Sequence, residues 1–205
     1  MRIIAGRYKG RRLATPTWAG LRPTSDKLRE TLFNILGPAI RAARVLDGYA
    51  GTGAVGIEAL SRGAAHVSFV EKDPRAIALI EANLARCGLG TPQRPDNRYA
   101  IIRAWFADVE KWLGEAAFDV IFLDPPYGAE ALVGALAAAE PLVGSETRLV
   151  IEHARRDTPA ERAGGVELTR IVTSGDSALA CYRRAAPAGR AAERPAGRPA
   201  ERPTE

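Results

Sequence analysis

Several residue types that would indicate a particular class of protein are scarce in this chain of 205 residues. Its two cysteines, Cys87 and Cys181, lie far apart and outside any CxxC pair, so we expect reduced thiols in a cytoplasmic protein rather than a disulfide framework. The two histidines, His66 and His153, lack metal-ligand spacing to a second ligand, and we predict no metal site. The chain has no apolar run of about 18 residues and no secretory signal at its start, so we expect no membrane association.

Positive charge, by contrast, is concentrated at the start of the chain. Residues 1–30 carry eight Lys and Arg against two acids, a net charge of +6 in a chain whose overall net charge is +5. A basic segment of this kind favours a polyanionic partner. A solvated basic surface without a partner is the alternative. The basic residues of the first fifteen that we assign to the contact are Arg7, Lys9, Arg11 and Arg12.

Short apolar β runs alternate with helical stretches through most of the chain. We expect strands at 44–47, 66–71, 99–103, 118–123, 147–152, 166–173 and 177–183, and helices near 53–62, 74–87, 108–113 and 128–140. This alternation predicts an α/β fold with a mostly parallel sheet. Ser-Gly-Asp between the last two runs is a hairpin signal, which makes at least one strand antiparallel. Seven strands with a terminal hairpin indicate a Rossmann-like class I methyltransferase fold.

The ends of the chain are expected to differ from this central domain. We predict that residues 1–22 form a small basic β-hairpin and that residues 185–205, rich in Ala, Pro and Arg, form a disordered tail. The central domain then covers residues 23–184. It begins with a helix that Thr24 or Ser25 caps and that Gly37-Pro38 ends, with Leu28, Leu32, Ile35 and Leu36 on its apolar face.

The stretch "VLDGYAGTGAVGIEAL" contains Gly51, Gly53 and Gly56 in the G-x-G-x-x-G spacing of a nucleotide-binding turn. Such glycines let a ligand approach the backbone ahead of a helix N-terminus. Asp47 and Gly48 end the preceding strand, and a carboxylate there would repel a diphosphate. S-adenosylmethionine carries a cationic sulfonium and ammonium and no phosphate, so Asp47 favours this methyl donor over NAD.

Two further strand ends supply polar groups for the adenosine part of such a cofactor. Glu71 can accept both ribose hydroxyls, a device that NAD enzymes also use. Lys72 follows it, and its stem either lies along the adenine or is simply solvated. Asp108 is placed to accept from the adenine amino group, although a helix N-cap explains it nearly as well.

The fourth expected strand ends in Asp124-Pro125-Pro126-Tyr127, which we take as the catalytic motif. Two consecutive prolines fix an extended turn, so the Pro125 carbonyl and the Asp124 carboxylate can both face an amino group. Two acceptors on its N–H bonds favour the reactive geometry of a base amine, and Asp124 or water can take the spent proton. Tyr127 offers a ring on which a flipped base can stack. A merely stiffened loop is the alternative.

Taken together, "RIIAGRYKGRRL", "RPTSDKLRETLFNIL", "VLDGYAGTGAVGIEALSRGA", "FVEKD" and "VIFLDPPYG" resemble the RsmD family of 16S rRNA (guanine-N2)-methyltransferases over about residues 2 to 183. The resemblance implies methyl transfer from S-adenosylmethionine to N2 of a guanine in 16S rRNA, within a partly assembled small ribosomal subunit. It also implies that Asp47, Gly51 and Gly53 hold the methionine part and that Arg22 joins the basic hairpin in contacting RNA phosphates. We expect a monomer.

Two alternatives stay open at this point. Asp-Pro-Pro-Tyr also suits a DNA adenine-N6 or cytosine-N4 methyltransferase, although the segment after Tyr127 is too short for a target-recognition domain. The second alternative is a noncatalytic RNA-binding protein with a degenerate methyltransferase fold. The presence of Asp47, Glu71 and Asp124 argues against it.

Overall fold

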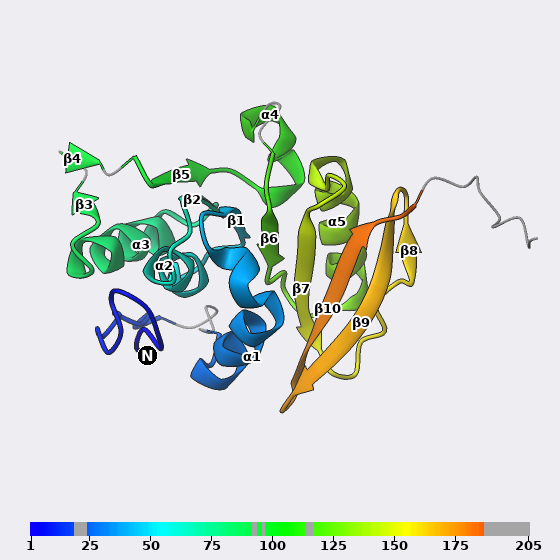
Figure 1. Cartoon of the computed structure of the whole chain (residues 1–205), viewed down its shortest axis with the longest axis horizontal. Coiled ribbons are helices and arrows are strands. Elements are labelled where there is room, and N and C mark those ends of the chain that lie inside the picture. Colours follow the sequence, from blue (N-terminus) through cyan, green and yellow to red (C-terminus); the bar gives the residue numbers. More distant parts are fainter. Residues whose placement is uncertain (19–23, 92–93, 96, 114–116, 187–205) are drawn as a thin grey trace, which may run out of the picture.

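A computed structural model describes residues 1–18, 24–91, 94–95, 97–113 and 117–186 of the chain. Its main sheet has eight strands in the order β5-β2-β1-β6-β7-β10-β9-β8 (Figure 1). Neighbouring strands from β5 to β7 are parallel, whereas β10 runs antiparallel to both β7 and β9. The alternating pattern and the final hairpin are thus confirmed. The expected count of seven is one too low, because the two-residue edge strand β8 carries no periodicity.

The strand bounds follow the apolar runs closely. The five parallel strands are β1 (Arg44–Gly48), β2 (His66–Glu71), β5 (Tyr99–Arg103), β6 (Val120–Leu123) and β7 (Arg148–Ala154). The antiparallel strands are β8 (Arg162–Ala163), β9 (Val166–Ser174) and β10 (Ser177–Arg184), with Gly175 at φ 65° in the tight turn between β9 and β10. A separate short pair joins β3 (Gly90–Thr91) to β4 (Arg94–Pro95).

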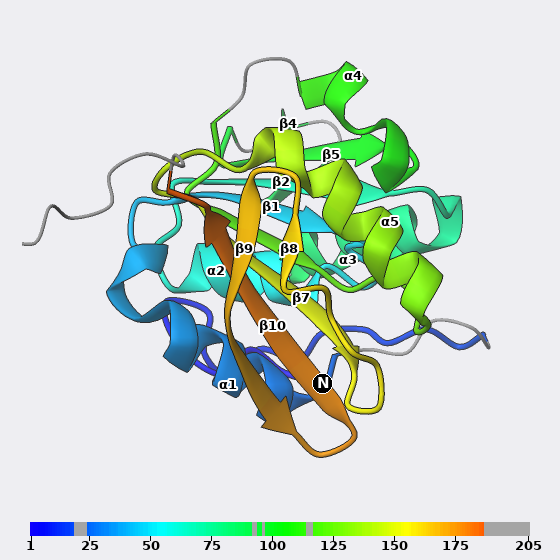
Figure 2. The same ribbon diagram turned by 90° about the vertical axis from the view of Figure 1, so that its right-hand side faces the viewer.

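Helices cover both faces of the sheet and enclose two apolar cores (Figure 2). On one face lie α1 (Asp26–Leu36), η1 (Gly37–Ile40), α2 (Ala54–Ser61) and α3 (Pro74–Arg86). On the other lie η2 (Phe106–Asp108), α4 (Glu110–Leu113), α5 (Ala129–Ala139) and η3 (Glu140–Leu142). None of the helices in the described ranges is long and apolar enough to span a bilayer.

Helix α1 forms as its sequence predicts. The Ser25 side chain accepts a hydrogen bond from the Leu28 N–H over 3.1 Å, and Gly37 follows the last helical residue with φ 54°. Leu28, Leu32 and Leu36 are buried, and Ile35 packs against the same core. A less expected member of the buried face is Arg29, whose side chain is fully buried.

The N-terminal arm, defined here as residues 1–18, folds back on itself around one isolated β-bridge between Arg2 and Arg12. The Ile3 N–H donates to the Arg11 carbonyl and the Gly10 N–H to the Ile3 carbonyl, both over 2.9 Å. Residues 1–18 of the predicted 1–22 hairpin thus fold back antiparallel about this single bridge and contain no strand. Residues 19–22 of that range lie outside the described residues, as do 187–205 of the expected tail.

In addition to the backbone hydrogen bonds within the arm, side chains of α2 and α3 accept hydrogen bonds from its backbone. Ile3, Tyr8 and Leu13 are buried in the core that α1, α2 and α3 share. The Glu58 carboxylate of α2 accepts the N–H groups of Ile4 and Ala5 over 2.7 and 2.9 Å. Ser61 Oγ, also of α2, accepts the Tyr8 N–H over 2.9 Å. Asn83 Oδ1 of α3 accepts the Ala14 N–H over 2.7 Å. The arm is thus built into the body of the protein.

Candidate active site

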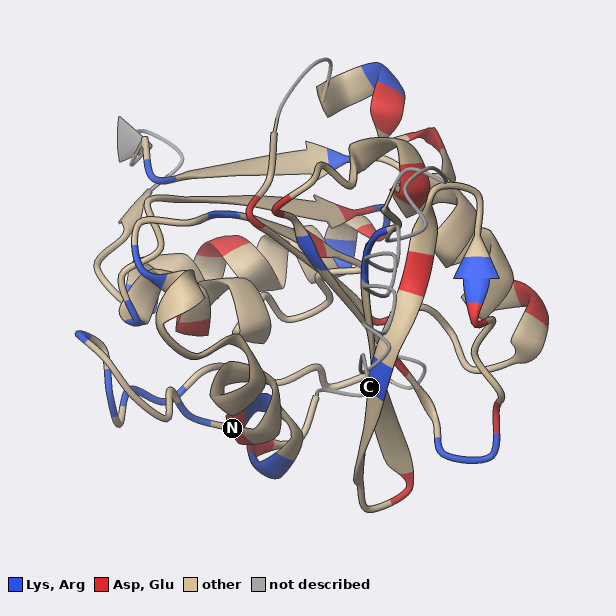
Figure 3. Cartoon of the chain, turned by 45° about the vertical axis from the view of Figure 1, so that its right-hand side comes forward, with Lys and Arg blue, Asp and Glu red and all other residues tan. Residues whose placement is uncertain are grey.

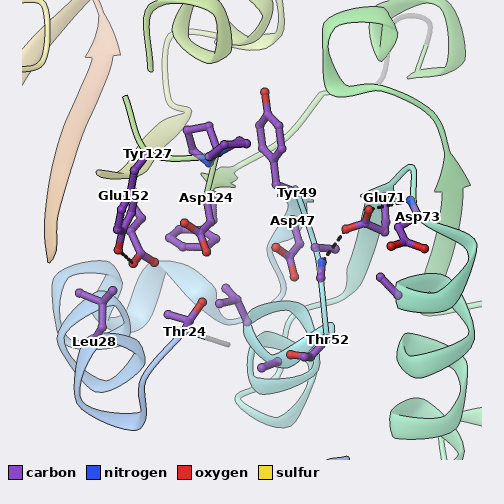
Figure 4. Close-up of a pocket in the computed structure, with 18 of the residues that line it drawn as sticks. Thr24, Leu28, Asp47, Tyr49, Thr52, Glu71, Asp73, Asp124, Tyr127 and Glu152 are labelled. Atoms are coloured by element: carbon purple, nitrogen blue, oxygen red, sulfur yellow. Dashed lines mark hydrogen bonds between the residues drawn. The ribbon is translucent and has the colours of Figure 1, made fainter. Parts of the chain in front are cut away.

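Four neighbouring parallel strands each carry an acid where they reach the same edge of the sheet. Asp47 lies in β1, Glu71 ends β2, Asp124 follows β6 directly and Glu152 lies in β7. All four line one cavity of about 690 Å³, into which their carboxylates point (Figure 4). Ligands of open α/β sheets bind at this edge, where the chain connections diverge to opposite faces. The cavity is therefore the candidate active site.

Asp47 lines this cavity, and a hydrogen bond from the end of the glycine motif holds its side chain. Its side chain is buried, and Oδ2 accepts the Gly56 N–H of α2 over 2.8 Å. Burial raises the pKa of Asp47 to about 8; the Gly56 hydrogen bond opposes this rise and the nearby Glu71 charge adds to it. A cation bound beside Asp47 would lower that pKa again.

Glu71 organises the backbone of the loop and of the turn after β2. Its Oε2 accepts the Gly51 N–H over 2.9 Å, and its Oε1 accepts the N–H groups of Lys72 (2.8 Å) and Asp73 (2.9 Å). A carboxylate offers about four acceptor positions, so these three bonds leave about one for a ligand. Glu71 therefore fixes the shape of the glycine loop as well as facing the cavity.

Asp124 projects into the cavity from the end of β6. The Thr24 hydroxyl donates a hydrogen bond to its carboxyl group and so links the segment before α1 to the Asp-Pro-Pro-Tyr motif. Burial raises the pKa of Asp124 well above its usual range, and the charges of Glu152 and Asp47 raise it further. A carboxylate whose pKa is raised is more basic than an ordinary one, so in its ionised form it takes up a proton more readily.

Glu152 is the site residue that sequence reasoning missed. Its side chain is buried, and Oε1 accepts from the Ser177 hydroxyl over 3.2 Å and from the Tyr127 hydroxyl over 3.4 Å. Its Oε2 is buried without a hydrogen-bond partner among the described residues. The signal was present in the sequence, because "RLVIE" ends an apolar run with an acid just as "VLD", "FVE" and "IFLD" do.

Aromatic and basic side chains line the other parts of the cavity. Tyr49 lies in the left-handed region with φ 61°, and its ring packs 5.2 Å from that of Phe106. A non-glycine residue in this region costs free energy and often marks a functional site. The Lys72 ammonium lies 3.4 Å from the centre of the exposed Trp105 ring, and Arg75 lies over Trp18.

The structure brings most of the predicted site residues to the cavity but not all of them. The lining includes Asp47, Gly51, Glu71, Lys72, Asp124, Pro125, Pro126 and Tyr127. Gly48 and Gly53 are not part of it: a Cβ at Gly48 would lie 2.4 Å from Leu123, and Gly53 is the N-cap of α2 at φ 73°. Both glycines therefore shape the backbone beneath the site.

Asp108 is also outside the cavity lining. It ends η2, half exposed, and its carboxylate pairs with Lys111 over 2.6 Å. Its assignment to the adenine amino group stays a prediction that would require this ion pair to open.

The predicted RNA-contacting residues Arg7, Lys9, Arg11 and Arg12 are all exposed on the N-terminal arm (Figure 3). Arg7 and Arg11 lie over the buried Tyr8 ring, and Arg11 also donates to the Arg86 carbonyl over 2.7 Å. Lys9 and Arg12 form no ion pair within the described part of the chain. Arg22 lies outside the described residues.

Comparison with solved structures identifies the class of protein that this fold and site define. The chain superposes on "Putative methyltransferase yhhF" of Escherichia coli with a TM-score of 0.73 and 31% sequence identity, covering 90% of this chain and 98% of that one. The predicted Rossmann-like class I methyltransferase fold is thus confirmed, with one strand more than expected in the main sheet.

Sequence comparison then gives the family. The family described as Conserved hypothetical protein 95 matches residues 1–183, and the chain belongs to this family. "Putative rRNA methyltransferase YlbH" of Bacillus subtilis is 37% identical over 90% of this chain and 99% of its own length. "Ribosomal RNA small subunit methyltransferase D" of Haemophilus influenzae is 40% identical over 62% of this chain and 64% of its own length. The predicted RsmD relationship is confirmed.

Proposed function

We propose that this chain is an S-adenosylmethionine-dependent methyltransferase that modifies the N2 amine of a guanine in 16S rRNA. The observation that carries the proposal is the convergence of Asp47, Glu71 and Asp124 on one cavity at the carboxyl edge of the sheet. The names of the relatives above support rRNA as the substrate. We propose further that the protein is a monomer that acts on a partly assembled small subunit.

The charge of the cavity fits the proposed methyl donor. Its lining holds six acids and two basic residues, and both basic side chains already lie against aromatic rings. Asp47 in particular is a buried carboxylate whose raised pKa reports an unfavourable environment for its charge. A ligand with a sulfonium and an ammonium relieves that environment, whereas a diphosphate worsens it.

S-adenosylmethionine, when bound, supplies an electrophilic methyl group on a cationic sulfur. The residues of this chain would position the base. Asp124, with the Pro125 carbonyl, accepts the N–H bonds of the guanine amine and directs the nitrogen lone pair at the methyl carbon. The methyl–sulfur bond would break as the new N–C bond forms, with the sulfur leaving as a neutral thioether. The amine loses a proton, which the ionised Asp124 carboxylate can take, and the raised pKa of Asp124 makes that carboxylate more basic than an ordinary one. Tyr127 stacks under the base.

The proposal is tested with purified protein, a labelled methyl donor, and small-subunit particles or 16S rRNA from cells that lack this protein. The expected product after nuclease digestion is N2-methylguanosine. Plasmid DNA serves as the second substrate, because the same motif suits adenine-N6 and cytosine-N4 amines. Label in DNA and none in rRNA would overturn the proposal. Calorimetry with the donor alone tests the noncatalytic alternative, since a degenerate fold would bind none.

A further inference from the structure

Glu152 has the features of a ligand-binding group that the methyl-transfer step described above does not use. It is 4% exposed, it lines the cavity, and its Oε2 has no hydrogen-bond partner among the described residues. A buried carboxylate oxygen without a partner is unfavourable, and a hydrogen-bond donor on a bound ligand would relieve it. The Ser177 and Tyr127 hydroxyls both bind Oε1. Oε2 is left for the cavity.

The position of Glu152 relative to Asp124 follows from the register of the sheet. Leu123 of β6 pairs with Ile151 of β7, so Asp124 and Glu152 occupy the next positions on adjacent parallel strands. Such strands lie about 4.8 Å apart. Both carboxylates point into the same cavity (Figure 4), and they are close enough that the charge of Glu152 acts on Asp124. The cavity therefore presents two acceptor groups side by side.

Two adjacent acceptors match the edge of one base only. Guanine has an amine at N2 and, next to it, a ring N1–H, so two neighbouring positions on its Watson–Crick edge are donors. Adenine and cytosine place a ring nitrogen lone pair beside the amine. If that lone pair faces a carboxylate oxygen, two acceptors meet, so the buried carboxylate oxygen has no hydrogen bond and the two groups repel each other. A pocket with acceptors for both positions thus discriminates between amine-bearing bases.

We propose that Glu152 is the residue that selects guanine, by accepting the N1–H of the flipped base through Oε2 while Asp124 accepts from the N2 amine. Ser177 and Tyr127 are positioning residues that hold the other oxygen of Glu152. This inference rests on the proposed function and adds to it the reason why adenine and cytosine are rejected.

The test uses an RNA substrate with either guanosine or 2-aminopurine at the methylated position, once that position is mapped with the wild-type protein. 2-Aminopurine keeps the N2 amine but has a lone pair at N1. The wild-type enzyme should methylate it roughly 10- to 100-fold less efficiently than guanosine, the effect of leaving a buried acceptor unpaired. In E152Q the side-chain amide can donate to that lone pair. The guanosine preference should therefore fall by roughly tenfold or more.

Glu130→Gln is the matched control, because it makes the same acid-to-amide change on the exposed surface of α5 and should keep the wild-type preference. Thermal unfolding of E152Q reports whether the variant is folded, and Glu152→Asp, which keeps the carboxylate, should keep the preference for guanosine. An unchanged preference in folded E152Q, with N2-methylguanosine still made by the wild type, would overturn this inference alone. A wild-type product other than N2-methylguanosine would overturn the proposed function.

Discussion

At the scale of single residues, Asp47 is an ionisable group that the fold buries at the candidate site, where its charged form is unfavourable. Its pKa in the folded protein is about 8, whereas an ordinary aspartate titrates near 3.8. Between these pH values the folded protein keeps a proton that the unfolded chain has released. The stability of the free protein therefore falls as the pH rises through this window.

Asp47→Asn should remove this dependence while keeping an oxygen for the Gly56 N–H. At pH 8 we expect the free energy of unfolding in urea to rise by about 1 kcal/mol or more relative to wild type, because one pKa unit corresponds to about 1.4 kcal/mol. Near pH 4 the two proteins should have the same stability. Affinity for S-adenosylmethionine should decrease in the variant. Equal stability at pH 8 would contradict the buried-charge account.

The roles of Asp124 and Glu71 should separate in kinetics. Asp124→Asn keeps the side-chain shape and removes the proton acceptor, so kcat should fall by about 100-fold or more with little change in donor affinity. Glu71→Gln places an amide against backbone N–H groups that the carboxylate now accepts, so donor affinity should fall by roughly tenfold. Rapid-quench assays and calorimetry measure the two quantities. A large decrease of donor affinity in Asp124→Asn would argue against its catalytic role.

Individual site residues could be predicted where the local sequence carries the chemistry. Asp47, Glu71 and Asp124 each end an apolar run beside a glycine or proline turn, and all three line the cavity. Glu152 also ends an apolar run with an acid, but no glycine or proline turn follows it, so it was missed, and its place beside Asp124 in the sheet brings it to the site. Arg29 was missed for a different reason: its spacing to Leu32 and Leu36 is that of the buried helix face, but a charged residue is not expected there. Glu58, Asp26 and the Arg2 carbonyl lie around its guanidinium.

At the scale of elements, the strands and long helices were predictable because hydrophobic periodicity and capping are local. The N-terminal arm was not, since the side-chain acceptors that anchor its backbone, Glu58, Ser61 and Asn83, lie more than fifty positions away in the chain. No local pattern reveals such partners. The space around two glycines of the arm, Gly6 and Gly10, shows where the arm packs closely against α2.

Gly6 and Gly10 form a natural matched pair for testing this docking. Both have φ near 80°, so alanine at either position has a similar backbone cost of about 1 kcal/mol. A Cβ at Gly6 would lie 1.9 Å from the Ser61 carbonyl oxygen, whereas a Cβ at Gly10 meets no atom within 4 Å. Gly6→Ala should therefore lower the free energy of unfolding by clearly more than Gly10→Ala. Equal effects in urea denaturation would show that the arm is not docked on α2.

At the scale of the whole molecule, the arm adds a basic surface to a body whose candidate site is acidic (Figure 3). A polyanionic RNA would be held by the arm while one base enters the acidic cavity. The phosphate contacts then supply affinity, and the cavity supplies chemistry and base selection. This division predicts that charge on the arm affects binding but not the identity of the product.

Lys9→Gln with Arg12→Gln tests the arm, because neither side chain forms an ion pair in the described chain. The slope of log affinity for rRNA against log salt should become shallower by about 0.7 for each phosphate that the arm no longer neutralises, with N2-methylguanosine still the product. Arg41→Gln with Arg44→Gln removes the same charge near the amino end of β1, away from the site, and should leave the slope unchanged. Identical slopes for the two double variants would show that RNA binds elsewhere.

The central claim is geometric: a donor methyl group must face the space between Asp124 and Glu152. A crystal structure with S-adenosylmethionine, or an unreactive analogue, measures this directly. We predict the ribose beside Glu71, the cationic groups beside Asp47, and the methyl carbon open to the gap between the carboxylates of Asp124 and Glu152. A methyl group that points away from Asp124, or that protein atoms wall off from it, would contradict the account.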